Sequence, residues 1–138
     1  MIGIVLVSDN EEEVNDLLAM IEVMIGLDSK VIVLPVGRSD SILGMSPLAI
    51  LKTLSFLEET TDIWIFCDSE SSQLSVRFAL ELLEDAEIQE RITFLPELPL
   101  VEGAYVAAVE GAIGRDKPGI MKTLELLRRE LEERDETN

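Results

Sequence analysis

The 138-residue sequence contains no histidine and a single cysteine, Cys67. Histidine is the side chain that most often transfers protons and binds metal ions at functional sites. Its absence excludes Ser–His and Cys–His nucleophile pairs, and it excludes zinc sites that combine imidazole with thiolate ligands. The residues before Cys67 are apolar, so we expect a buried and unreactive thiol. A lone cysteine cannot form an internal disulfide, which fits a reducing compartment.

Basic residues are also scarce. Only 11 Lys and Arg stand against 28 Asp and Glu, and the formal net charge is −17. Nucleic-acid binding normally requires a basic surface, so nucleic acid and anionic membranes are poor partners. No apolar run reaches the ~18 residues of a membrane span, and no basic segment precedes the first apolar run as it would in a secretory signal. We therefore expect a cytoplasmic protein without membrane insertion.

What the sequence does contain is a regular alternation of short apolar runs with amphipathic segments. Hydrophobic residues make up 47% of the chain, enough for one packed domain over residues 1–138. The two kinds of segment predict strands at 4–7, 30–36, 62–67 and 91–95. They predict helices at 11–25, at 47–59 with Ser46 as N-cap, and at 118–133. A further helix after the third strand has Val76, Ala79, Leu80 and Leu83 on one face. This order predicts an α/β fold, a doubly wound three-layer sandwich around a mainly parallel four-stranded sheet of order 2-1-3-4.

Some segment boundaries carry their own signals. Asn10 or Asp9 is a suitable N-cap for the first helix, and Gly26 is a suitable stop. Pro35 indicates a strand end or an edge strand, and residues 37–44 have the composition of a loop. The segment 101–113 is rich in Ala and Gly, and it fits either a tightly packed helix or a fifth strand at a sheet edge. We expect residues 134–138 to fray.

Polar residues that follow the first and third strands mark the expected site. Ligands of parallel α/β sheets bind outside the carboxyl ends of the strands, and right-handed crossovers bring the ends of strands one and three together. The candidate residues are Ser8, Asp9, Asn10, Asp68, Ser71 and Ser72. Two close carboxylates repel each other, so a cation such as Mg²⁺ between them, or protonation of one, would be needed. The alternative is that each aspartate only caps the helix after it.

Three stretches of the chain carry a family resemblance; they read IGIVLVSDN, DIWIFCDSESSQLSVRFALELL and PLVEGAYVAAVEGAIG. They resemble the phosphocarrier subunit of the phosphotransferase-dependent dihydroxyacetone kinase, which belongs with the mannose-type EIIA domains. The resemblance spans residues 2–125 and implies a single EIIA-like domain. It also implies a cytoplasmic homodimer that works with dihydroxyacetone-kinase-type subunits. In that family, a histidine just after the first strand carries a phosphoryl group.

The same resemblance places Asp9 at the position of the phosphoacceptor histidine, because Val7-Ser8-Asp9-Asn10 stands where the family has a Val-Ser-His-Ser type sequence. Asp68 matches the acidic residue that orients the histidine. After Asp68, the residues Ser69-Glu70-Ser71-Ser72 replace a Gly-Ser type turn. The resemblance therefore implies a relative that keeps the fold and the docking surface but does not carry phosphohistidine.

The residues and the resemblance together leave three functions open. The leading hypothesis is a regulatory or docking protein of a dihydroxyacetone-kinase or phosphotransferase-type system. The second is a receiver-like protein that forms an aspartyl phosphate, with Mg²⁺ near Asp9 and Asp68. The third is an enzyme or binding protein for a small metabolite in the same cleft. We expect no cofactor apart from that magnesium alternative.

Overall fold

The computed structural model describes residues 1–26, 29–37 and 46–137. At its centre lies a sheet of four parallel strands in the order β2-β1-β3-β4, as the sequence predicts. The strands are β1 (Ile2–Ser8), β2 (Val31–Gly37), β3 (Asp62–Cys67) and β4 (Ile92–Phe94). Pro35 lies on β2, which is an edge strand, so its missing N–H leaves no gap in the centre of the sheet.

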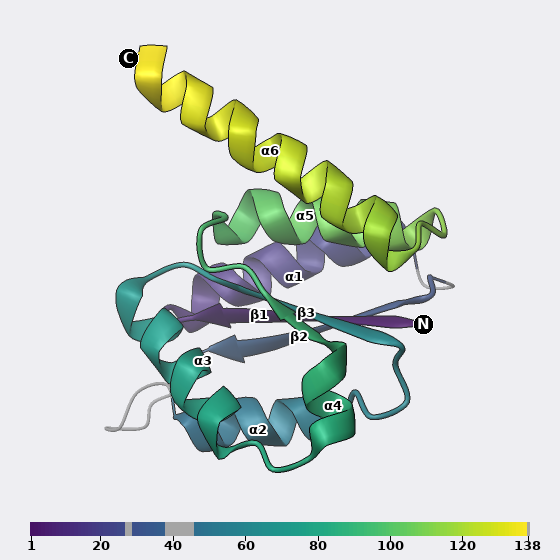
Figure 1. Ribbon diagram of the computed structural model, residues 1–138, viewed down its shortest axis with the longest axis vertical. Coiled ribbons are helices and arrows are strands. Elements are labelled where there is room, and N and C mark those ends of the chain that lie inside the picture. Colours follow the sequence, from purple (N-terminus) through teal and green to yellow (C-terminus); the bar gives the residue numbers. More distant parts are fainter. Residues whose placement is uncertain (27–28, 38–45, 138) are drawn as a thin grey trace.

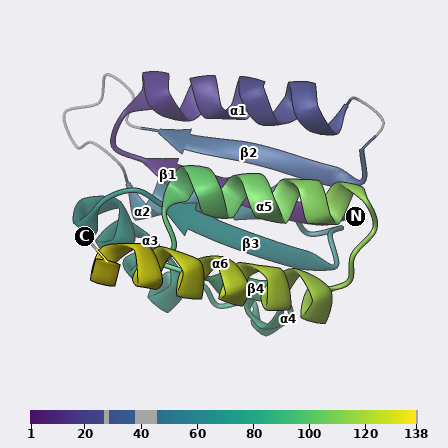
Figure 2. The ribbon, with the colours of Figure 1, turned by 90° about the horizontal axis from the view of Figure 1, so that it is seen from above.

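Helices cover both faces of the sheet and complete a three-layer sandwich (Figures 1 and 2). One face carries α1 (Glu11–Ile25), α5 (Leu100–Ala112) and α6 (Lys117–Thr137), and the other carries α2 (Pro47–Ser55), α3 (Glu70–Leu82) and α4 (Ala86–Arg91). Successive residues of β1 point to opposite faces, so Ile4 and Leu6 enter one core while Val5 and Val7 enter the other. Burial on both faces explains why β1 is a continuous apolar run.

The segment whose state the sequence left open is the helix α5, so the fifth strand is not found among the described residues. Glycine lets this helix lie close to the sheet. A Cβ atom at Gly103 would lie 2.7 Å from the ring of Phe66, and one at Gly111 would lie 2.5 Å from Cδ1 of Ile2. Close packing of backbone against the sheet is therefore what the Ala and Gly residues of this segment provide.

The last helix is longer than predicted. α6 continues through Thr137 instead of ending at 133, and residue 138 lies outside the described residues. Arg134 forms an ion pair with Glu130, one turn earlier on the same helix, which supports the last turns. None of the helices in the described part of the chain is long and apolar enough to cross a membrane.

Other boundaries also differ from the prediction. The helix α3 begins at Glu70, because Ser69 is its N-cap, and therefore Ser71 and Ser72 are helical rather than part of a turn. The helix α2 has the predicted N-cap Ser46 but ends at Ser55 instead of continuing to 59. The short helix α4 was not predicted. Of the expected loop at 37–44, Gly37 ends β2 and the remainder lies outside the described residues.

Candidate functional site

The candidate site lies at the carboxyl ends of the two central strands. β1 and β3 are parallel neighbours in which Val7 pairs with Cys67. The next residues, Ser8 at the end of β1 and Asp68 directly after β3, therefore lie side by side at the same edge of the sheet. This register brings together two segments that are sixty residues apart in the sequence.

Ser8 anchors the first half of the site. Its side chain is fully buried, and its hydroxyl donates a 2.6 Å hydrogen bond to Oδ2 of Asp68. Oγ of Ser8 also accepts the backbone N–H of Asn10 at 3.0 Å. Ser72, also fully buried, donates to Oδ1 of Asp68 at 3.1 Å. Both carboxylate oxygens of Asp68 are therefore held by buried serine hydroxyls, although the residue itself is exposed.

Asp9 is held in a similar way by the opposite segment. Oδ2 of this half-buried residue accepts hydrogen bonds from the hydroxyls of Ser69 and Ser71. Ser69 in turn begins α3 through a capping box, in which Ser69 Oγ accepts the N–H of Ser72 and Ser72 Oγ accepts the N–H of Ser69. The start of α3 thus fixes the donors that hold Asp9.

Neither aspartate is the N-cap of the helix that follows it, so the simple capping explanation is wrong. Asn10 caps α1 by accepting the N–H of Glu13 at 3.1 Å, and Ser69 caps α3. The side chain of Asn10 is consequently turned toward its own helix, and only its backbone joins the bonds around Ser8. Of the candidate residues, the structure brings Ser8, Asp9, Asp68, Ser71 and Ser72 together in one network.

Ser69 is the residue of this network that sequence reasoning missed. It bonds to Asp9 and bridges to both Ser71 and Ser72. The signal was present, since a serine directly before a glutamate at the start of an amphipathic run is a typical N-cap. The thiol of Cys67, directly before Asp68, is buried as expected, and burial raises the pKa of this thiol above its usual value.

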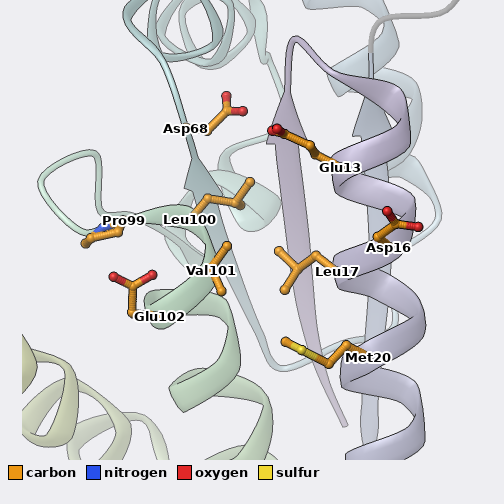
Figure 3. A pocket seen from close by; sticks show the side chains of 9 residues that line it. All are labelled: Glu13, Asp16, Leu17, Met20, Asp68, Pro99, Leu100, Val101 and Glu102. Carbon is orange, nitrogen blue, oxygen red and sulfur yellow. The ribbon is translucent and has the colours of Figure 1, made fainter.

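A groove of about 540 Å³ opens beside this network between α1 and α5, and we call it the α1–α5 groove (Figure 3). Leu17 and Met20 of α1 face Leu100 and Val101 of α5 across it. Its remaining lining residues are Glu13, Asp16, Asp68, Pro99 and Glu102. Asp68 therefore belongs both to the serine network and to the groove. No local pattern in the sequence predicts the groove, because its two walls come from helices more than seventy residues apart.

Comparison with known proteins gives consistent matches. Residues 3–121 match the EIIA-man family, described as the PTS system fructose IIA component. The chain is 40% identical over 124 residues to the phosphoryl donor subunit DhaM of PEP-dependent dihydroxyacetone kinase 2 from Listeria innocua, covering 90% of this chain and 97% of that protein.

Two further proteins are similar to this chain. It is 34% identical over 77 residues to the DhaM subunit of Pantoea ananatis, a match that covers 56% of this chain but only 16% of that longer protein. A crystal structure of EF1359, a protein of unknown function, superposes with a TM-score of 0.74 at 30% identity and covers 88% of this chain and 90% of the other.

Proposed function

The chain belongs to the EIIA-man family of PTS system fructose IIA components, and on that premise we propose that it is a docking or regulatory subunit that does not carry phosphohistidine. It would act in a dihydroxyacetone-kinase or phosphotransferase-type system. The observation that carries the proposal is the absence of histidine from the 138-residue sequence. A phosphohistidine relay needs an imidazole nitrogen as nucleophile, and no other side chain provides one.

The arrangement around Asp9 supports this proposal. In the family resemblance this residue stands where the phosphoacceptor histidine is expected, at the end of β1. The hydroxyls of Ser69 and Ser71, which an incoming phosphoryl group would use as donors, already bind the Asp9 carboxylate. Glu70 adds a further exposed carboxylate at the start of α3. The site is thus built around fixed negative charge, which opposes the approach of phosphate.

The proposed partners of this chain are taken from the named function of a similar protein. The Listeria innocua protein is named as the phosphoryl donor subunit of a dihydroxyacetone kinase, and this chain aligns with 97% of its length. We therefore propose dihydroxyacetone-kinase-type subunits as partners, a cytoplasmic location and a homodimer. With its fold kept and its acceptor changed, the chain would bind these subunits without passing a phosphoryl group to them.

A labelling experiment tests the proposal. The purified chain is incubated with phosphoenolpyruvate and the general phosphotransferase proteins, and its mass is followed beside that of a DhaM protein with an acceptor histidine. We expect the DhaM protein to gain one phosphoryl group and this chain to gain none. Native mass spectrometry with dihydroxyacetone-kinase subunits should then show a complex. Phosphorylation of this chain, or the absence of any complex, would overturn the corresponding half of the proposal.

A second candidate is an aspartyl phosphate formed in a receiver-like manner, as Asp9 and Asp68 do lie together at the ends of adjacent strands. Such a site would need Mg²⁺, yet the described residues contain no group of three or more His, Cys, Asp or Glu side chains placed to hold a metal ion. Incubation with acetyl phosphate and Mg²⁺ decides the matter, because a phosphoryl mass gain that is lost in an Asp68→Asn variant would favour this candidate. A small metabolite bound in the same cleft stays a third alternative.

A further inference from the structure

The α1–α5 groove combines an apolar floor with an acidic rim. Leu17 and Leu100 are buried and form the floor, whereas Met20 and Val101 remain 43% and 48% exposed. One turn further along the same two helices, Met24 and Tyr105 are also exposed, at 44% and 37%. Residues four apart share a face of a helix, so the apolar strip extends beyond the groove along both of its walls.

All charges on the rim have the same sign. Glu13 and Asp16 of α1, Glu102 of α5 and Asp68 at the end of β3 are exposed carboxylates, and none of the nine lining residues is Lys or Arg. Carboxylates of α1 and α5 stand on opposite walls, so a segment lying in the groove would pass between them. Such a rim attracts a cationic segment and repels an anionic one.

The same charges argue against a second copy of this chain in the groove. A symmetric contact would place the four rim carboxylates of one copy near those of the other. The chain as a whole carries a net charge of −17, which adds to the repulsion at longer range. A partner of different composition is therefore favoured over self-association at this surface.

We infer that the α1–α5 groove is the docking surface for a partner subunit, and that it receives a segment of that subunit with exposed apolar side chains flanked by Arg or Lys. The inference rests on the proposed function, since it takes the partner to be a dihydroxyacetone-kinase-type subunit. The apolar side chains would cover Met20 and Val101, and the basic side chains would pair with Glu13, Asp16 and Glu102. Asp68 links this surface to the serine network, so a docked segment would contact the network through Asp68.

The experiment measures the affinity of purified dihydroxyacetone-kinase subunits for the full chain by calorimetry, at low and high salt. The groove variant is E13Q/D16N/E102Q, which keeps side-chain size and removes three charges. Its matched control is E58Q/E84Q/E90Q, which removes three exposed charges from segments that cover the opposite face of the sheet. We expect the groove variant to bind about tenfold more weakly and to lose most of the salt dependence, and the control to bind within about twofold of the parent chain.

A second pair of variants tests the apolar half of the surface. M20S/V101S reduces the exposed apolar strip of the groove, and L74S/F78S does the same to two exposed residues on α3. We expect binding to weaken only in the first variant. Thermal unfolding of every variant, measured in parallel, separates a local effect from a loss of fold.

Three results would overturn the inference, and they are distinguishable. Equal binding by the parent chain and both groove variants would place the partner elsewhere and leave the proposed function intact. Failure of the parent chain to bind any kinase subunit would remove the proposed function together with the groove's partner. Sedimentation of the parent chain as a dimer and of M20S/V101S as a monomer would assign the groove to a second copy.

Discussion

The hydroxyl of Ser8 donates a 2.6 Å hydrogen bond to Asp68, sixty residues further along the chain. Ser69 donates to Asp9 in return, so the adjacent pairs Ser8-Asp9 and Asp68-Ser69 exchange hydrogen bonds across the ends of β1 and β3. Each strand end thus supplies both a carboxylate and the hydroxyl that holds the other carboxylate. Asp9, the position that the family resemblance assigns to the phosphoacceptor, is therefore held in place by hydrogen bonds from residues at the start of α3.

An imidazole placed at position 9 should enable the chain to accept a phosphoryl group. In Asp9→His the nucleophile would stand at the end of β1, with Asp68 nearby to orient it. We expect this variant to accept a phosphoryl group from phosphoenolpyruvate through the general phosphotransferase proteins, as measured by mass spectrometry. Asp9→Asn is the matched control and should stay unlabelled. A folded Asp9→His protein that also stays unlabelled would contradict the placement of Asp9 at the acceptor position.

Removing the hydroxyl of Ser8 should destabilise the fold. Ser8→Ala leaves the N–H of Asn10 and one oxygen of Asp68 without this buried partner. An unmade buried hydrogen bond costs about 1–3 kcal/mol, and we expect a loss of that size in the free energy of unfolding in urea. Ser71→Ala, at an exposed position, should cost less than about 1 kcal/mol. Equal losses in the two variants would show that burial of Ser8 is not what matters.

The N-cap of α1 can be tested on a single helix with one type of substitution. Asn10→Ala removes the acceptor of the Glu13 N–H and should lower the free energy of unfolding by about 1 kcal/mol. Asn15→Ala lies at an exposed position in the interior of the same helix. It should raise the free energy of unfolding by roughly a few tenths of a kcal/mol, because alanine has the higher helix propensity. Chemical denaturation of both variants is the measurement. A loss at position 15 as large as that at position 10 would argue against a capping effect.

Cys67 should resist alkylation in the folded protein. Cys67 is 5% exposed, and burial is the main reason that the pKa of its thiol is raised, so at neutral pH the reactive thiolate is scarce. The folded state disfavours the thiolate of Cys67. The part of the free energy of unfolding that depends on this thiol is therefore fully present below the usual thiol pKa, and it is lost as the pH rises through the raised pKa of the folded state. We expect iodoacetamide to modify the chain only after unfolding in urea. Native modification at the rate of a free thiol would show that the site opens.

Gly103 should not tolerate a methyl group. The Cβ atom of Gly103→Ala would lie 2.7 Å from Cδ1 of Phe66, whose ring is fully buried and cannot move aside. Overpacking costs about 1–3 kcal/mol, which exceeds the roughly 1 kcal/mol that alanine gains over glycine in a helix. Thermal unfolding should therefore show a lower midpoint. In α6, Gly119→Ala meets mainly the side chains of Asp116 and Arg115 and should change stability by less than about 1 kcal/mol.

Local signals predicted most of the secondary structure but not all of it. Strand β3 and helix α1 have the predicted bounds, because an apolar run and an amphipathic run with clear caps decide them within a few residues. The segment of α5 stayed open, because nearly half of its residues are Ala or Gly and these fit either state until Phe66 and Ile2 are known to lie beneath it. The helix α6 extends beyond its predicted end at 133, and charged residues in its last turns form ion pairs along the helix.

Residue type and local periodicity are enough to predict the class of fold and the strand ends that carry polar residues, and the absence of an imidazole is plain from the composition. How these parts meet depends on the packing of the folded chain. The parallel register of β1 and β3 lets Ser8 donate a hydrogen bond to Asp68 and Ser69 donate one to Asp9. The packing of α5 beside α1 makes an apolar groove with a carboxylate rim. Both arrangements arise from contacts between residues far apart in the chain, and no local pattern encodes such contacts.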